Sequence, residues 1–507
     1  MLHPADLGAL PEIAAQRHAD VPLLSDTPWL GLDRDVRTVG DFAWAVHEYA
    51  DRLWATGVRR GATVAVVKAN HYDIQALACA AIRVGAVPAL LSVRMAPDEL
   101  VTCLGLLDRP VLLVDADGIE RLAAYAESLP RLTSGVFALH APGAGWAPTL
   151  DASGHHEPIP WSGDGPMIIT HSSGTTGAPK LVAQSADSLY GHAAPQIAVA
   201  RQLDTTGIAA KCLSFVHART ASGLVAMLTV TMPFLALSNT APEDVAEQLV
   251  AHRPQGLETH PNLFLLWESL GTRPQRPFAS VERFLTSFDA VHPRTVRALL
   301  NGSDQPNPVY LQAYGQTETG PVTLRAVHRA DLDTLDETSR NVGRPFPGIT
   351  DVRIVDDAGE SVPAGTPGYI EARTPGRGHS IIGQPPLPGP GEWWPMGDIG
   401  RITENGSLEL LDRVADRLAG TASLLRLEDR LLDALPQLLE VVLTPGPDGA
   451  LVVTVCTADD QPLELELWAK AAVTAGLPAD TGFTQRRWAD LPWTGSWKVR
   501  RHRIGTR

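Results

Sequence analysis

Between residues 38 and about 115, stretches with helical periodicity alternate with short, largely apolar runs. Residues 42–57 have the spacing of an amphipathic helix that ends at a glycine, whereas residues 61–67 resemble a buried strand. The same pattern recurs in two further helices, 74–84 and 97–107, and two further strands, 86–91 and 110–114. Strands separated by helices of this length pair in parallel, so the sequence predicts an α/β fold built on helix-flanked sheets.

The pattern changes after about residue 320, and this change defines the expected domain organisation. Beyond residue 341, short strands separated by Pro/Gly clusters predict a small β-rich subdomain, with strands at 352–355, 368–373 and 407–411. After Arg413 a compact α+β pattern follows, with a helix at 427–438 and strands at 441–443 and 450–457. A chain of 507 residues exceeds what one hydrophobic core usually supports. We therefore expect a large N-terminal domain, residues 1–413, and a small mobile C-terminal domain, residues 414–507.

Composition narrows the classes of partner and compartment. The net charge of -15, without a basic stripe, argues against a nucleic-acid partner. Four widely separated cysteines lack metal-site or CxxC spacing, and no signal-peptide pattern is visible, so we expect reduced thiols in a cytoplasmic protein. The uncharged run 221–238 is interrupted by Ser, Gly, Thr and Pro, which favours a buried helix followed by a buried strand over a membrane span.

The segment from Thr170 to Lys180, THSSGTTGAPK, is the densest chemical signal in the chain. Backbone N–H groups of a Gly-rich turn converge on phosphate oxygens, hydroxyls add donors, and a lysine adds a point charge. Lysine is rare here, because 37 of the 42 basic residues are arginine. The segment is not a Walker A loop, since Pro179 precedes the lysine and Leu181 follows it. We expect phosphate binding by Ser172, Ser173, Gly174, Thr175, Thr176, Gly177 and Lys180.

Three further motifs follow at informative distances: YGQTETG at 314–320, MGDIG at 396–400 leading to Asp412-Arg413, and PWTGSWKVR at 492–500. Together with the loop at 170–180 they resemble the ANL superfamily of adenylate-forming enzymes. That superfamily includes acyl- and aryl-CoA synthetases, adenylation domains of nonribosomal peptide synthetases, amide synthetases and luciferases. The order and spacing of the motifs match from about residue 20 to residue 507.

The resemblance implies that ATP and Mg²⁺ bind at these motifs. Thr317 would offer a hydroxyl to the α-phosphate, and Glu318 a hard oxygen ligand to Mg²⁺. Tyr314 would offer its ring face to adenine, while Asp398 and Arg413 would bind the ribose. Each of these residues taken alone has an ordinary structural explanation, as a strand end, a turn residue or a surface cation, but their combination favours a nucleotide site.

Lys498, another of the rare lysines, lies in the last motif. In the resembling enzymes this lysine bridges the substrate carboxylate and the α-phosphate, and it stabilises the charge that develops during adenylation. We therefore expect Lys498, together with Thr317 and Glu318, to be catalytic.

The chain departs from the family pattern at two kinds of position. The family usually has Asp or Lys at the hinge where this chain has Ala415, and its pantetheine-contacting Gly-rich segment is shortened at 417–424. CoA and a carrier-protein arm therefore stay open as acceptors. Phe288 and Trp497 stand where the family usually has glycine. Two bulky residues would narrow the site, which favours a small or flat acid.

The resemblance places the pocket for the acid around residues 214–219. His217, Arg219, Phe288 and Gly315 are the expected substrate-binding residues, and no aspartate for an α-amino group is evident. We expect a ligase of natural-product pathways that activates a small or aromatic carboxylic acid as acyl-AMP, releases pyrophosphate, and transfers the acyl group to a thiol or an amine. One alternative is a diazotase that activates nitrite for an aryl amine. Another is a non-catalytic nucleotide-binding relative, against which the retained motif residues argue.

Overall fold

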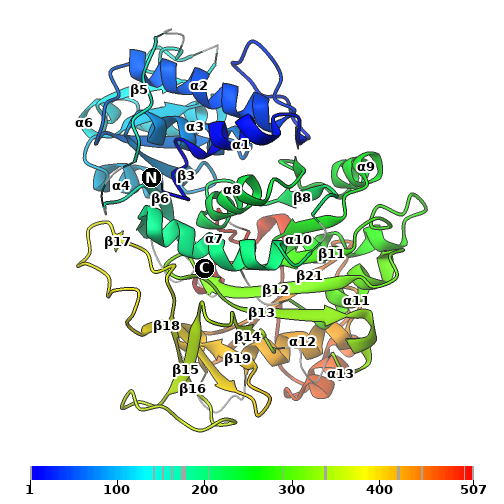
Figure 1. Cartoon of the computed structure of the whole chain (residues 1–507). Coiled ribbons are helices and arrows are strands. Elements are labelled where there is room, and N and C mark those ends of the chain that lie inside the picture. The colour runs from blue at the N-terminus through cyan, green and yellow to red at the C-terminus, as the bar shows by residue number, and fades with distance from the viewer. Residues whose placement is uncertain are drawn as a thin grey trace.

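The computed structural model describes residues 3–140, 143–150, 154–161, 163, 165–172, 179–203, 205–288, 291–335, 340–418, 423–446, 449–495 and 497–504. Their helices and strands form two large sheets with helices between and around them, a smaller antiparallel sheet, and a C-terminal α+β unit (Figure 1). The expected α/β class with a β-rich subdomain is confirmed.

A seven-stranded sheet contains the strands predicted from the first alternating stretch. From edge to edge its strands are β17 (Ser380–Ile381), β7 (Leu181–Gln184), β6 (Ile168–His171), β3 (Val87–Ser92), β2 (Thr63–Lys68), β4 (Val111–Val114) and β5 (Gly135–Ala138). The pairs from β6 to β5 are parallel, as expected, whereas β6–β7 and β7–β17 are antiparallel. Helices in this part of the chain include α1 (Leu10–His18), α2 (Val39–Ala55), α3 (Asp73–Arg83), α4 (Pro97–Leu106), α5 (Ala116–Leu122) and α6 (Leu129–Leu132).

An eight-stranded sheet forms the second half of the N-terminal part. Its strands run in the order β1 (Leu23–Ser25), β9 (Phe234–Ala236), β8 (Ala209–Cys212), β10 (Gly256–Thr259), β11 (Arg283–Thr286), β12 (Val309–Gln316), β13 (Gly320–His328) and β14 (Arg344–Pro345). Strands β1 to β12 pair in parallel, and the hairpin β12–β13 begins the antiparallel edge.

Helices α7 (Ala186–Ala200) and α8 (Ala218–Val230) lie between the two large sheets (Figure 1). Together with α3 and with side chains of β2 and β9 they form the largest apolar core. Around the second sheet lie α9 (Pro242–His252), α10 (Pro261–Leu266) and α11 (Pro293–Gly302). The uncharged run 221–238 thus belongs to a buried helix and strand, α8 and β9. Within the described ranges no helix is long and apolar enough to cross a bilayer.

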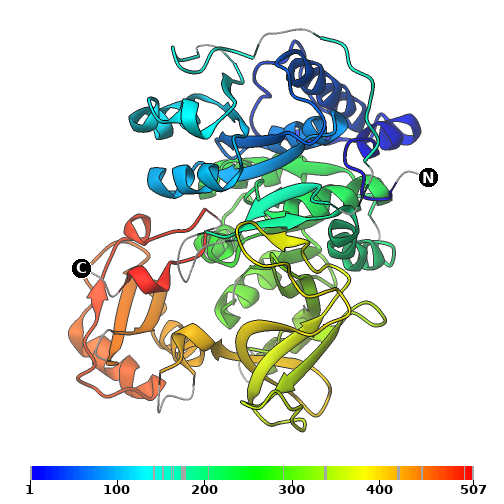
Figure 2. The same ribbon diagram turned by 90° about the vertical axis from the view of Figure 1, so that its left-hand side faces the viewer.

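The expected β-rich subdomain is a four-stranded antiparallel sheet with its own apolar core. Its strands are β15 (Asp351–Val355), β16 (Gly368–Arg373), β18 (Trp394–Ile402) and β19 (Leu408–Arg413). Figure 2 shows the C-terminal unit, in orange and red, beside this sheet, in yellow.

The C-terminal unit has a three-stranded sheet, two helices and a separate apolar core. Its elements are α12 (Leu424–Ala434), β20 (Leu438–Pro445), β21 (Leu451–Thr457), α13 (Leu465–Ala475) and β22 (Thr484–Gln485). The helix predicted at 427–438 was placed too late. It begins after Ser423, whose hydroxyl accepts the Arg426 N–H at 3.2 Å. It ends at Ala434 because Pro436 follows and cannot occupy a helix interior. The domain boundary at 413 stays a prediction.

Candidate active site

A cavity of about 700 Å³ opens between α7 and α8, the eight-stranded sheet, the four-stranded sheet and the loop that carries Lys498. Twelve of the residues that the sequence predicted for the site line it: Ser172, Lys180, His217, Arg219, Phe288, Tyr314, Gly315, Thr317, Glu318, Asp398, Arg413 and Lys498. The chain therefore brings residues more than three hundred positions apart to one cavity.

The structure describes the two ends of the phosphate loop predicted at 170–180, and these ends are hydrogen-bonded to each other. The Ser172 N–H donates to the Lys180 carbonyl at 2.8 Å, and the Lys180 N–H donates to Ser172 Oγ at 3.1 Å. These bonds close the loop where β6 ends and β7 begins. The predicted residues Ser173, Gly174, Thr175, Thr176 and Gly177 lie outside the described residues.

One end of the cavity carries a phenol, a carboxylate and a guanidinium from two different sheets. Tyr314, on β12, donates its hydroxyl to Asp398 Oδ2 at 2.6 Å. Asp398, on β18, is paired in register with Arg413 on β19. Burial, and next the Asp398 carboxylate, raise the pKa of Tyr314 well above its ordinary value. The phenol therefore stays protonated and orients the carboxylate.

The turn between β12 and β13 carries Thr317 and Glu318 into the cavity. A Cβ on Gly315 would lie 2.0 Å from the Gly320 carbonyl oxygen, so only glycine allows the two strands to approach this closely. The Thr317 carbonyl accepts from Gln184 Nε2 at 2.8 Å, and the Glu318 carbonyl accepts from the Gly378 N–H at 2.8 Å. The turn is thus held by its backbone, which leaves the two side chains for the cavity.

His217 caps the N-terminus of α8 and faces this turn. Its Nδ1 accepts from the Arg219 N–H at 3.1 Å, so the proton of the neutral ring sits on Nε2. That Nε2 lies 3.3 Å from Thr317 Oγ1 and donates to it. Burial lowers the pKa of His217 well below its ordinary value, and neighbouring His171 and Lys498 lower it further. His217 is therefore a neutral hydrogen-bond donor at neutral pH.

Lys498 projects from a tight loop near the C-terminus. The Thr494 N–H donates to the Lys498 carbonyl at 2.8 Å, and the Lys498 N–H donates to Thr494 Oγ1 at 3.0 Å. Two residues tie this loop to the N-terminal part of the chain: Asn262 Nδ2 donates to the Trp497 carbonyl at 2.9 Å, and the Arg94 guanidinium stacks 3.7 Å above the Trp497 ring.

Of the two bulky residues that were expected to narrow the cavity, Phe288 lines it and Trp497 does not. Phe288 lines the cavity and has a backbone φ of 90°. Its ring packs on those of His217 and His260, with centroids 4.8 and 4.2 Å apart. Trp497 also has positive φ, 56°, but it turns away into a separate cavity of about 100 Å³. Its indole is held there by Arg94, a contact that no sequence pattern predicted.

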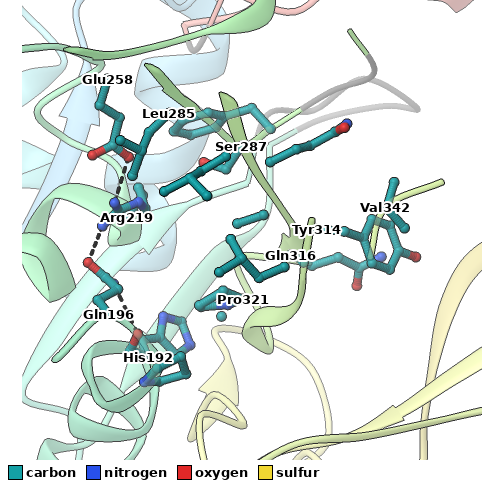
Figure 3. Close-up of a pocket in the computed structure, with 18 of the residues that line it drawn as sticks. His192, Gln196, Arg219, Glu258, Leu285, Ser287, Tyr314, Gln316, Pro321 and Val342 are labelled. Atoms are coloured by element: carbon teal, nitrogen blue, oxygen red, sulfur yellow. Dashed lines mark hydrogen bonds and ion pairs between the residues drawn. The ribbon is translucent and has the colours of Figure 1, made fainter. Parts of the chain in front are cut away.

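At the opposite end of the cavity from Tyr314 lies a polar cluster, of which sequence reasoning named Arg219 and missed Lys211 and Glu258 (Figure 3). Glu258, on β10, binds Arg219 at 2.6 Å and Lys211, on β8, at 3.1 Å. Lys211 is one of the five lysines, and both it and Glu258 interrupt short apolar strands. A charged residue inside a buried strand was the available signal.

Comparison with known proteins places this site in a family. The profile of the AMP-binding enzymes matches residues 12–379. This chain belongs to the family of AMP-binding enzymes. It is 36% identical to 3-amino-2-hydroxy-4-methoxybenzoate diazotase of Streptomyces cremeus over 98% of this chain and 94% of that protein. It is 25% identical to 3-aminoavenalumate diazotase of a Streptomyces species, over 85% of this chain and 79% of that protein.

The fold of this AMP-binding enzyme is similar to that of a solved structure. Amide bond synthetase McbA from Marinactinospora thermotolerans superposes with a TM-score of 0.77 at 22% identity, covering 99% of both chains. The expected membership of the ANL superfamily and the adenylate-forming type of activity are thereby confirmed.

Proposed function

We propose that this AMP-binding enzyme is an ATP-dependent diazotase, which activates nitrite as a mixed anhydride with AMP and passes the nitrosyl group to an aryl amine. The observation that carries the proposal is the 36% identity to a diazotase over 98% of the chain. The shape of the cavity supports it. Phe288 packs against His217 and takes up space there, so that a small acid fits beside these two side chains. The whole cavity, of about 700 Å³, accommodates an aryl ring as well.

In this proposal the adenosine binds against Tyr314, and its ribose hydroxyls donate to Asp398, whose carboxylate the Tyr314 hydroxyl already orients. Arg413, in register with Asp398, donates to the ribose from the other side. The loop between Ser172 and Lys180 holds the two phosphates that leave as pyrophosphate, and the Lys180 ammonium offsets their charge.

Glu318 fits a Mg²⁺ site because this ion is usually held by one or two carboxylates together with substrate phosphates. Among the described residues no three His, Cys, Asp or Glu side chains cluster as a metal cage, which agrees with that mode of binding. The ion would neutralise phosphate charge during the reaction.

Lys498 and Thr317 act on the reacting atoms. A nitrite oxygen attacks the α-phosphorus of ATP, forming a P–O bond as the bond to the pyrophosphate oxygen breaks. Lys498 offers a positive charge to the oxygens where negative charge develops. Thr317 donates its hydroxyl to an α-phosphate oxygen, and the His217 Nε2–H fixes the direction of that hydroxyl by donating to its oxygen.

The second step joins two nitrogen atoms. The nitrogen of the aryl amine attacks the nitrosyl nitrogen, an N–N bond forms, the N–O bond to AMP breaks, and one amine proton is released. The N-nitroso product tautomerises, takes up one proton and loses water, which leaves the aryl diazonium ion. The histidines beside the site, His217 and His260, stay uncharged at neutral pH, so they add no positive charge beside the neutral amine nitrogen that attacks.

A carboxylic acid ligase is the second candidate, because the same groups would serve an aromatic carboxylate and the fold matches an amide bond synthetase. The two functions separate in one experiment. Purified protein is mixed with ATP, Mg²⁺ and 3-aminobenzoate, with or without nitrite, and AMP and pyrophosphate are followed. We expect AMP only when nitrite is present, together with a diazonium product that is detected by its absorbance. AMP formation from the aromatic acid without nitrite, in the presence of CoA or a second amine, would establish the ligase instead. ATP binding without any AMP formation would refute both.

A further inference from the structure

The inner end of the cavity is built as a charged site. Glu258 and Lys211 are neighbours in register on β10 and β8, and Arg219 reaches them from the first turn of α8. Their side chains are 4%, 12% and 14% exposed, so all three are removed from bulk water. Two cations therefore share one carboxylate in a buried position. Burial lowers the pKa of Lys211, Arg219 adds to this effect, and Glu258 offsets part of it.

The neighbouring polar groups do not supply a second negative charge. Arg219 also donates to Gln196 Oε1, and Gln196 Nε2 donates to Ser222 Oγ at 2.9 Å and to the His192 carbonyl at 3.0 Å (Figure 3). Burial lowers the pKa of His192 to about 4, so its ring is neutral. Arg283, which also lines the cavity, pairs with its own neighbour Glu282 at 2.9 Å. Among the described residues at this end, positive charge is in excess.

Space beside the two cations is kept open by a glycine. Gly223 lies on the face of α8 that lines the cavity, and a Cβ there would come within 3.2 Å of Arg219 Nη1 and 3.3 Å of Lys211 Nζ. A methyl group would thus occupy the place from which a ligand oxygen reaches both donors. The lining of the cavity also includes apolar side chains, Met227, Leu285 and Phe288 among them, against which an aromatic ring can pack.

We propose that Lys211 and Arg219 bind the carboxylate of an aromatic amine at the inner end of the cavity, which points its amino group toward Lys498. The proposal rests on the diazotase function proposed above and adds the substrate class: aryl amines that carry an acidic group on the ring. A carboxylate is an acceptor that matches an ammonium and a guanidinium placed side by side. A carboxylate bound there serves for recognition and lies out of reach of the α-phosphate of ATP. The substrate is therefore nitrosated on its amino group, and its carboxylate is not adenylated.

The test compares 3-aminobenzoate with aniline, which lacks only the carboxylate. Wild-type protein is expected to prefer 3-aminobenzoate in kcat/KM, and Arg219→Met to lose about 10- to 100-fold of that preference, as for a lost charge-assisted hydrogen bond, because only 3-aminobenzoate carries the group that Arg219 binds. Gly223→Ala keeps every charge and replaces a glycine inside a helix by a better helix former, so it is expected to fold and to lose the same preference by blocking the space. Arg201→Met, an exposed cation after α7, is the matched control and should retain the preference.

Direct binding separates this proposal from the diazotase function. Calorimetric titration with benzoate needs neither ATP nor nitrite. We expect binding that Arg219→Met and Gly223→Ala weaken and Lys498→Ala leaves in place. If benzoate binds in this way but nitrite is not used, the carboxylate site stands and the diazotase function falls. If the variants weaken aniline and 3-aminobenzoate equally, or benzoate binding depends on Lys498 and not on Arg219, the carboxylate site is refuted. Should Arg219→Met not fold, Gly223→Ala decides alone.

Discussion

At the scale of single residues, the site separates charged groups from neutral ones. His217 and His260 lie near Lys498, and burial together with its charge lowers the pKa of both rings, that of His260 to about 3. These rings bind and orient without adding charge. The positive charge beside these two rings therefore comes from Lys498, whose loop is held in place by hydrogen bonds from Thr494 and Asn262.

We expect Lys498→Ala to reduce adenylate formation by about 10²- to 10³-fold, as for other preorganised groups that meet developing charge. ATP affinity should change little, because the residues proposed to contact adenosine lie on β12, β18 and β19. Pyrophosphate exchange measures the first quantity and equilibrium titration the second. Lys470→Ala removes an exposed lysine from α13 and should behave as wild type. Unchanged exchange in Lys498→Ala would contradict the assigned role.

At the scale of helices and strands, periodicity predicted most of the N-terminal elements, because buried faces repeat at fixed intervals. The helix at 427–438 was misplaced since one proline outweighed the periodicity. The site was predictable where four motifs carried it, as for Tyr314, Thr317 and Asp398. Arg219 was predicted as a substrate-binding residue, but its pairing with Lys211 and Glu258 was not predictable, because it depends on which strands become neighbours in a sheet and on a helix that packs across them.

The hairpin β12–β13 offers a test at this scale. Gly315→Ala should push the strands apart, because the new Cβ would lie 2.0 Å from the Gly320 carbonyl oxygen. Thr317 and Glu318, in the turn, would then leave their positions. We expect a lower melting temperature and at least a tenfold loss of adenylate formation. Gly145→Ala is the control, since a Cβ there meets no atom within 4 Å. Wild-type stability and activity in Gly315→Ala would show that the turn tolerates the shift.

At the scale of the whole molecule, the cavity is complete only because the C-terminal unit is docked, and buried ion pairs add to the contacts that Trp497 makes with Asn262 and Arg94. Arg500 donates to Glu99 of α4 from its two terminal guanidinium nitrogens, Nη1 and Nη2, at 2.5 and 3.0 Å. On the other side, Asp429 of α12 accepts from His292 at 2.7 Å and pairs with Arg340 at 2.9 Å. Burial alone would raise the pKa of Glu99, but hydrogen bonds from Arg500 and from the Ala96 N–H hold it below its ordinary value. The carboxylate is therefore charged whenever the unit is docked.

The Glu99 contact contains its own control, because two arginines reach the same carboxylate. Arg500 is 4% exposed, whereas Arg503, whose Nη2 lies 3.3 Å from Glu99 Oε1, is 50% exposed. Removing one partner of a buried pair costs about 3–5 kcal/mol, since the other charge stays buried and uncompensated. An exposed pair contributes at most about 1 kcal/mol.

Arg500→Met should therefore weaken docking and lower pyrophosphate exchange more than 100-fold, as estimated from the cost of removing one partner of a buried pair. Arg503→Met should lower it about fivefold at most. ATP affinity should be retained in both variants, which distinguishes undocking from unfolding. Equal effects of the two substitutions would mean that the Glu99 contact does not control the closed arrangement that brings Lys498 to the phosphates.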